Sequence, residues 1–275
     1  MLTSSELALT EVYPPTTYTD IRAMKKAVAD TRNRLVTEDI NQYLSFKHVS
    51  PKDFSFIDAH RRQLGAVRFT YFQDISTLII KVPTRAHEIA HRNFERMISS
   101  QFGAMNIGID QFLSLGSTLY VGPTASKKEG DSAFTNSVLR PLESDWPALV
   151  IEAGVSESMP RLRQDAQWWI SNSEGKVHIV LLIKVTRNAR SMVFEKYVPE
   201  VLMFRQPRIS APHSYRAVLV STTEVHQGAN PPYVSGPPVI LEFQRVLCRP
   251  PVPPERDIQL GPAELLLLAR LVFPH

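Results

Sequence analysis

A pair of long apolar segments separated by one amphipathic stretch sets the strongest limit on the fold. PALVIEAG covers residues 147–154, and VHIVLLIKV covers residues 177–185. Runs this apolar are typical of central strands that are covered on both faces. Between them, MPRLRQDAQWWIS at 159–171 predicts a helix that ends within residues 172–175. This order of strand, helix and strand predicts an α/β fold.

Shorter elements surround this pair of strands. Apolar spacing and turn residues predict a helix over 18–35, two strands joined by a turn within 67–82, a helix from Thr84 to about 102, strands at 117–121 and 131–134, and an edge strand at 192–198. From residue 84 onward, the predicted order is therefore helix, three strands, helix and strand.

The two ends of the chain differ in composition from the middle. Proline is frequent after residue 200, where two strand-like runs at 216–222 and 239–247 precede a short helix at 263–272. We therefore expect three parts: an N-terminal extension (1–45), a core (46–200) and a Pro-rich C-terminal region (201–275) packed on the core. The role of the last region is open, and a homodimer contact there is compatible with the sequence.

The overall composition is that of a folded protein: 43% of the 275 residues are hydrophobic and 21% are charged. No apolar run approaches the ~20 residues that span a bilayer, and the N-terminus lacks the pattern of a signal peptide. The single cysteine, Cys248, excludes an intramolecular disulfide and a Cys-rich zinc site. We expect an intracellular protein without a membrane segment, in the nucleus or cytoplasm. Its net charge of +4 permits a polyanionic partner.

The segment HEIAH, residues 87–91, matches the H-E-x-x-H pattern of zinc metalloproteases. Histidines four residues apart lie on one helical face and can both reach a zinc ion. A catalytic zinc also needs a third protein ligand, and Met97 stands where the extended motif has its third histidine. We therefore expect mainly a helix in which Glu88 pairs with Arg92, and a zinc metalloprotease is the least favoured hypothesis.

A carboxylate interrupts the most apolar predicted strand. Glu152 lies within LVIEAGV, and a buried carboxylate is costly unless it is paired or bound to a metal. Asp131 lies in KKEGDSAF, at the turn that enters the preceding predicted strand. Taken singly, Glu152 is explained by an arginine or lysine partner, and Asp131 by its place in a turn. Both also belong to a longer stretch with a more specific resemblance.

The stretch from EGDSAF to VHIVLLIKV, residues 129–185, resembles a group of fungal proteins. These are similar in turn to the PD-(D/E)XK nuclease superfamily, including its Uma2-like endonuclease branch, and the resemblance extends over about residues 84–200. It implies a restriction-endonuclease-like core of helix, three-strand meander, crossover helix and strand, with N- and C-terminal elaborations. It also implies an endonuclease that cleaves phosphodiester bonds, with DNA or RNA as its partner.

The resemblance assigns a metal site to the two carboxylates. In this superfamily, an Asp and a Glu on successive strands hold Mg²⁺ or Mn²⁺, which activates a water molecule for attack on phosphorus. Asp131 and Glu152 match these positions. The helix before the first strand often adds another carboxylate, for which Glu95 is the candidate and Glu88 the alternative.

One part of the family pattern is missing. The superfamily's lysine normally stands two residues after the Glu, where this chain has Gly154. In the Uma2-like branch the lysine moves to the following helix, where Asp165 or Gln167 would take its catalytic place. The alternative function is therefore a catalytically inactive nuclease-fold module that binds nucleic acid or another partner.

Basic side chains flank the proposed site and could contact phosphates. The candidates are Lys127, Lys128, Arg161 and Arg163. A solvated, charged turn explains the lysine pair about as well. Trp168 and Trp169 could stack on bases, although we expect at least one of them to pack in the core.

Overall fold

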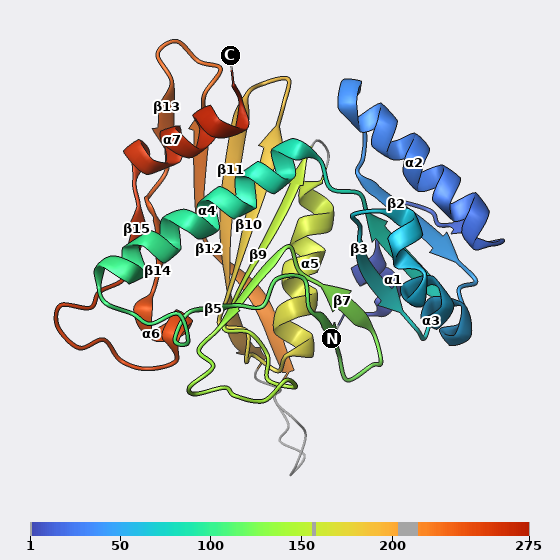
Figure 1. Cartoon of the computed structure of the whole chain (residues 1–275), viewed down its shortest axis with the longest axis horizontal. Helices are drawn as coiled ribbons and strands as arrows, with labels where there is room; N and C mark the ends of the chain where they lie inside the picture. The colour runs from blue at the N-terminus through green and yellow to red at the C-terminus, as the bar shows by residue number, and fades with distance from the viewer. Residues whose placement is uncertain (1, 156–157, 203–213, 275) are drawn as a thin grey trace.

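The computed structural model describes residues 2–155, 158–202 and 214–274, arranged around two main sheets (Figure 1). The larger sheet has seven strands, in the spatial order β13 (Tyr233–Ser235), β12 (Ser214–His226), β11 (Ser191–Leu202), β10 (Ile179–Thr186), β9 (Leu149–Val155), β8 (Ser132–Thr135) and β5 (Leu113–Ser114). Only β9 and β10 pair in parallel, and the other neighbours in this sheet are antiparallel.

The smaller main sheet has six strands, in the order β1 (Thr16–Thr17), β2 (Tyr43–Lys47), β4 (Thr77–Lys81), β3 (Arg68–Phe72), β7 (Lys127–Glu129) and β6 (Leu119–Val121). The chain thus leaves the larger sheet after β5, contributes β6 and β7 to the smaller sheet, and returns as β8. Only residues 130 and 131 separate β7 from β8, so the two sheets meet there. A separate pair, β14 (Val239–Leu241) and β15 (Ile258–Leu260), completes the strands.

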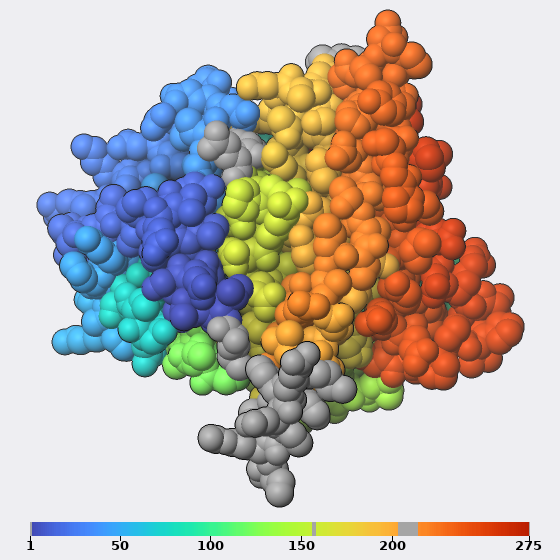
Figure 2. Space-filling model, turned by 180° about the vertical axis from the view of Figure 1, so that it is seen from behind, coloured from blue at the N-terminus to red at the C-terminus, as the bar shows by residue number. Residues whose placement is uncertain are grey.

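Helices cover both faces of the larger sheet. The long helix α4 (Arg85–Ala104) crosses one face beside α7 (Pro262–Val272), and α5 (Met159–Asn172) covers the other (Figure 1). Seen from behind, α5 lies between the N-terminal segment and the C-terminal strands (Figure 2). The remaining helices are α1 (Ser4–Ala8), α2 (Ile21–Thr37), α3 (Pro51–Ala59), α6 (Phe243–Leu247) and a 3₁₀ turn, η1 (Arg61–Leu64).

The alternation of side chains along β9 explains why this strand is apolar throughout. Leu149 and Ile151 belong to the hydrophobic cluster that includes α4, whereas Val150 belongs to the cluster beneath α5. Every residue of β9 is buried, as predicted for a strand covered on both faces. Glu152 is on the same side of the strand as Val150, and it therefore points toward α5.

The structure confirms an α/β class and most of the predicted helices and strands. Thr84 caps α4 as expected, since its hydroxyl accepts from the backbone N–H of His87. No helix within the described residues has the length and apolar character to cross a membrane. The predicted N-terminal boundary near residue 45 lies inside β2, and residues 203–213 of the predicted C-terminal region lie outside the described residues.

Three predicted strands differ in the structure. The strand expected at 117–121 is β6 of the smaller sheet, and the short β5 takes its place beside β8. The expected edge strand at 192–198 is β11, which pairs with β10 and β12 on its two sides. Its charges Glu195 and Lys196 are accommodated there by ion pairs with Arg163 and Glu242. The run at 239–247 is β14 followed by the helical turn α6.

Candidate functional site

The two predicted metal carboxylates lie opposite each other on neighbouring strands. Ser132 of β8 pairs with Ile151 of β9, so the same antiparallel register places Asp131 opposite Glu152. The ammonium of Lys81, at the end of β4, lies between them: its Nζ is 2.6 Å from Asp131 Oδ2 and 3.1 Å from Glu152 Oε2. The larger sheet therefore supplies the acids and the smaller sheet supplies a cation.

A second lysine extends this arrangement toward α5. Lys128 Nζ, from β7, is 3.2 Å from Glu152 Oε1 and 2.9 Å from Asp165 Oδ1. The indole N–H of Trp169 donates to Glu152 Oε1 at 2.8 Å, and the backbone N–H of Ala153 donates to Asp131 Oδ2 at 2.7 Å. We call the five charged residues the lysine–carboxylate network: Lys81, Lys128, Asp131, Glu152 and Asp165.

Burial and charge together set the proton affinities in the network. The five side chains are at most 7% exposed. Burial alone would lower the pKa of Lys81, but Asp131 and the other acidic groups outweigh it and raise that pKa well above its ordinary value. Burial would likewise raise the pKa of Asp131, but the charges of His87 and Lys81 hold it well below its usual range. Burial raises the pKa of Glu152, and the two lysines offset this only in part.

Two glycines allow the backbone to approach the network closely. A Cβ atom at Gly130 would lie 3.2 Å from the indole of Trp169. A Cβ at Gly154 would lie 2.4 Å from Ser158 Oγ and 2.7 Å from its Cβ. Position 154 therefore has no room for any side chain unless Ser158 moves.

The first turns of α4 touch the network at Asp131. His87 Nε2 is 3.0 Å from Asp131 Oδ2, and His91 Nδ1 is 2.9 Å from the hydroxyl of Ser132. That hydroxyl donates to Glu95 Oε2 at 3.2 Å. Glu95, the predicted third metal carboxylate, is thus joined to the site through Ser132.

The predicted pairing of Glu88 with Arg92 is present, with Glu88 Oε2 2.7 Å from Arg92 Nε. Glu88 also lies close to both histidines, and His87, Glu88 and His91 form a group whose ligand atoms could hold a metal ion. We call these three residues the histidine cluster.

The other predicted site residues lie apart from this centre or are engaged within the molecule. Gln167 accepts a hydrogen bond from the backbone N–H of Ala217 on β12, so Asp165 is the residue of this pair that reaches the network. Arg161 is buried and donates to the carbonyls of Leu7 and Ala8.

The remaining predicted phosphate contacts differ in how far their side chains are exposed to solvent. Lys128 is inside the network rather than facing a ligand, whereas Lys127 lies over the ring of Phe54. Arg163 is 53% exposed and paired with Glu195. Of the four predicted phosphate contacts, Lys128 and Arg161 therefore have their cationic groups committed to buried internal partners. Both tryptophans, 168 and 169, are buried as well.

Two features of the site were not predicted from the sequence: Lys81 and the contact of His87 with Asp131. A signal for Lys81 was present, because it ends the apolar run TLIIK, just as Glu152 interrupts LVIEAGV. A charged residue at the end of a strand is ordinarily solvated, and only the packing of the smaller sheet against the larger one buries this ammonium.

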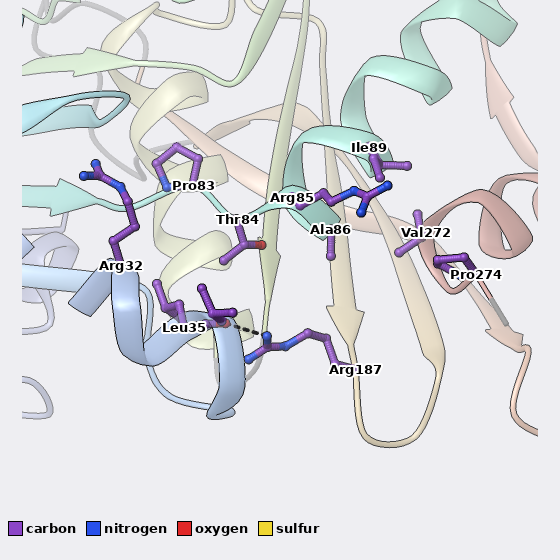
Figure 3. A pocket seen from close by; sticks show the side chains of 11 residues that line it. Arg32, Leu35, Pro83, Thr84, Arg85, Ala86, Ile89, Arg187, Val272 and Pro274 are labelled. Carbon is purple, nitrogen blue, oxygen red and sulfur yellow. Dashed lines mark hydrogen bonds between the residues drawn. The ribbon is translucent and has the colours of Figure 1, made fainter. Parts of the chain in front are cut away.

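A groove of about 390 Å³ lies beside the N-terminus of α4 but apart from the network (Figure 3). It is bordered by α2, α4, the turn after β10 and the C-terminal end of α7. Two of its arginines are bonded to backbone: Arg187 donates to the carbonyl of Leu35 at 2.6 Å, and Arg32 to that of Leu64 at 2.8 Å. Both arginines are thus held by backbone carbonyls, and none of the residues that line the groove belongs to the lysine–carboxylate network.

No family model matches the chain, and no curated protein sequence matches it significantly.

Proposed function

We propose that this chain is a metal-dependent nuclease that cleaves phosphodiester bonds in DNA or RNA, with Asp131 and Glu152 as its metal-binding carboxylates. The observation that carries the proposal is the position of the Lys81 ammonium between these two side chains. Paired carboxylates and an adjacent lysine are the groups that the chemistry requires, because hard cations prefer carboxylate oxygens and the transition state is rich in negative charge.

The arrangement of strands supports the same proposal. The elements α4, β5, β8, β9, α5 and β10 follow one another as helix, antiparallel meander, crossover helix and parallel strand. This is the order that a restriction-endonuclease-like core implies, with β6 and β7 inserted between its first two strands. The inserted hairpin brings Lys128, and β4 of the same smaller sheet brings Lys81.

Lys81 can take the role of the superfamily's lysine, whose usual position in the sequence is occupied here by Gly154. It reaches the acidic pair from the opposite sheet, so the positive charge is present although its position in the sequence has changed. Its charged form holds Asp131 ionised, and an ammonium at this place can donate a hydrogen bond to an attacking water or a phosphate oxygen.

The acidic residues fit a hard cation. Asp131 Oδ1 and Asp165 Oδ2 are buried oxygens without a hydrogen-bond partner among the described residues, so each has a lone pair free for a metal. Asp131 and Glu152, with Glu95 nearby, would hold Mg²⁺ or Mn²⁺, which supplies charge neutralisation and a water of lowered pKa. The contacts of Trp169 and Ala153 keep the two carboxylates in fixed orientations.

A second candidate, an inactive nuclease-fold interaction module, is favoured by the burial of the same residues. The carboxylates of Asp131 and Glu152 are 0% and 1% exposed, and each is paired with a lysine. A polymeric substrate reaches such a site only if the segments around it move. If they do not move, the network serves to join the two sheets.

The test is a cleavage assay with the full chain on supercoiled plasmid and on single-stranded RNA, with Mg²⁺ or Mn²⁺. We expect cleavage by the wild type and a loss of at least about 100-fold in Glu152→Gln, since transition-state charge stabilisation by one group is worth this much. Glu143→Gln changes an exposed acid in the same way and serves as the matched control.

The outcomes separate the two candidates. Equal cleavage by wild type and Glu152→Gln would mean a contaminating nuclease and would contradict the proposal. A folded wild type that cleaves neither substrate with either metal would favour the inactive module, and binding of the same nucleic acids, measured by fluorescence anisotropy, would then show whether the module recognises them.

A further inference from the structure

The histidine cluster on α4 has the geometry of a metal site distinct from the Asp131–Glu152 pair. Its three ligand atoms lie within 4.8 Å of one another. Glu88 is central: Oε1 is 3.5 Å from His87 Nδ1, and Oε2 is 3.6 Å from His91 Nε2. One helical turn therefore presents two imidazoles and a carboxylate to a common point.

The two ring nitrogens that face Glu88 lack a hydrogen bond of ordinary length. His87 and His91 are 0% and 1% exposed, yet the described residues offer His87 Nδ1 and His91 Nε2 only the Glu88 carboxylate, at 3.5 and 3.6 Å. Burying an unsatisfied polar atom costs about 1–3 kcal/mol. Such atoms are rare in folded proteins unless a ligand satisfies them.

The hydrogen bond at Ser132 fixes which nitrogen of His91 has a lone pair. The Ser132 hydroxyl donates its one hydrogen to Glu95, so it can only accept from His91 Nδ1. The proton of a neutral His91 is therefore on Nδ1, and its Nε2 lone pair faces Glu88.

His87 has the complementary arrangement. Its Nε2 faces the ionised Asp131 at 3.0 Å, which favours the proton on that nitrogen. The lone pair of a neutral His87 is then on Nδ1, on the side of Glu88. Once His87 has lost its second proton, two lone pairs and a carboxylate face one another, an arrangement that a cation stabilises.

We propose that His87 Nδ1, His91 Nε2 and the carboxylate of Glu88 bind a borderline divalent metal of the zinc class. Imidazole nitrogen suits such metals, and metal-bound histidines usually have a carboxylate or hydroxyl at the other ring nitrogen, as Asp131 and Ser132 are here. In the H-E-x-x-H proteases the Glu acts on water, whereas Glu88 contacts both histidines and is itself a ligand. The Glu88 side chain is 30% exposed, which leaves an open side for water or an exogenous group.

The site goes beyond the proposed nuclease function, because it uses a different set of ligands. Asp131 is the one residue that both share: it orients His87 and would itself hold the magnesium-class cation. Binding of the zinc-class metal can therefore be measured whether or not the chain cleaves nucleic acid.

The test is titration of the chelator-treated full chain with Zn²⁺ and with Co²⁺. We expect one equivalent to bind, Co²⁺ to give the intense visible bands of a four- or five-coordinate site, and X-ray absorption at the zinc edge to show imidazole scattering. Glu88→Gln and His91→Asn should weaken binding by more than about 100-fold, beyond the effect of removing an outer partner.

Two control variants show whether the bound metal belongs to the histidine cluster. His48→Asn changes an exposed histidine at positive φ, a conformation that asparagine tolerates, and should leave binding unchanged. Glu152→Gln should also keep the zinc-class metal, although it removes the proposed nuclease activity. If His91→Asn does not fold, the spectra of the wild type and the binding of Glu88→Gln decide the matter.

Any of three results would overturn the proposal. One is a wild type that binds neither metal at concentrations well above that of the protein. Another is binding with no imidazole scattering, and the third is binding that Glu88→Gln leaves as tight as in the wild type.

Discussion

The lysine–carboxylate network and the histidine cluster are both buried, and they meet at Asp131, but they satisfy their polar atoms in different ways. In the network, each carboxylate contacts at least one lysine, and both lysines contact two carboxylates. In the histidine cluster, the two ring nitrogens that face Glu88, His87 Nδ1 and His91 Nε2, lie 3.5 and 3.6 Å from its carboxylate, which is longer than an ordinary hydrogen bond. Buried polar atoms without a close partner mark the places for a ligand in both regions: Asp131 Oδ1 and Asp165 Oδ2 in the network, and the ring nitrogens that face Glu88 in the cluster.

The two regions also differ in how the chain assembles them. The histidine cluster comes from a single helix, so its members are neighbours as soon as α4 forms. The network combines β4, β7, the start of β8, β9 and α5, which belong to two sheets and a helix. The first is a local motif, and the second exists only in the complete fold. This difference predicts how each region responds to substitution.

The largest effect on stability is expected from Lys81→Met, which removes one of the two cations that neutralise the buried carboxylates of the network. It removes the cation shared by two buried carboxylates while retaining much of the apolar stem. We expect the free energy of unfolding to fall by about 3–5 kcal/mol, as for other buried pairs that lose one partner. Urea denaturation followed by circular dichroism measures this change.

Lys176→Met is the matched control, because Lys176 is an exposed lysine outside the network. It should change the free energy of unfolding by less than about 0.5 kcal/mol. A loss below about 1 kcal/mol in Lys81→Met would mean that the network is more open to solvent than its burial indicates.

A smaller effect is expected from Ser132→Ala, which alters the link between the two regions. The substitution leaves His91 Nδ1 and Glu95 without their shared hydroxyl, at a cost of about 1–2 kcal/mol in the free energy of unfolding. It should also weaken Zn²⁺ binding by about 10–100-fold, because the proton of His91 is no longer held on Nδ1. Denaturation without metal and competition with a chromophoric chelator measure the two effects separately.

Ser55→Ala removes a hydroxyl that bonds only within its own helix, and it should leave Zn²⁺ binding unchanged. Unaltered Zn²⁺ affinity in Ser132→Ala would show that the hydroxyl does not orient the imidazole.

The smallest effect is expected from Arg92→Ala, which removes an exposed ion pair beside the buried groups. Arg92 pairs with Glu88 across one turn, and its side chain is 65% exposed. Solvent screens such a pair, so the free energy of unfolding should fall by only about 0.3–0.5 kcal/mol. Measuring the free energy of unfolding of both Arg92→Ala and Lys81→Met under the same conditions compares an ion pair at the surface with one between the sheets. A cost above about 2 kcal/mol would contradict the view that exposure sets the difference.

The sequence predicted the layers around the larger sheet better than it predicted the connections between sheets. Strands β9 and β10 and helices α4 and α5 follow from apolar periodicity, which depends only on residues near one another in the chain. The place of residues 119–121 in the smaller sheet could not be predicted in this way, because a short strand carries little information about its partner. The pairing of β11 on both sides was not predicted for a similar reason, since the pattern of one strand does not show how many neighbours it has.

The residues of the candidate site also fall into those that could be recognised from the sequence and those that could not. Glu152 was recognisable from the sequence, because an acid inside an apolar strand needs a partner wherever that strand lies. The i and i+4 spacing of His87 and His91 was also recognisable, since the pitch of a helix fixes which side chains share a face. Such features depend on local geometry that every helix or strand repeats.

The groups that complete the site could be identified only from the tertiary packing. Lys81 is 50 residues from Asp131 and 71 from Glu152 along the chain, and nothing local to either acid indicates that it lies between them. It arrives there because the smaller sheet packs against the larger one at the short link between β7 and β8. The amino-acid sequence thus specified which residues require partners, and the packing of the two sheets determined which partners they have.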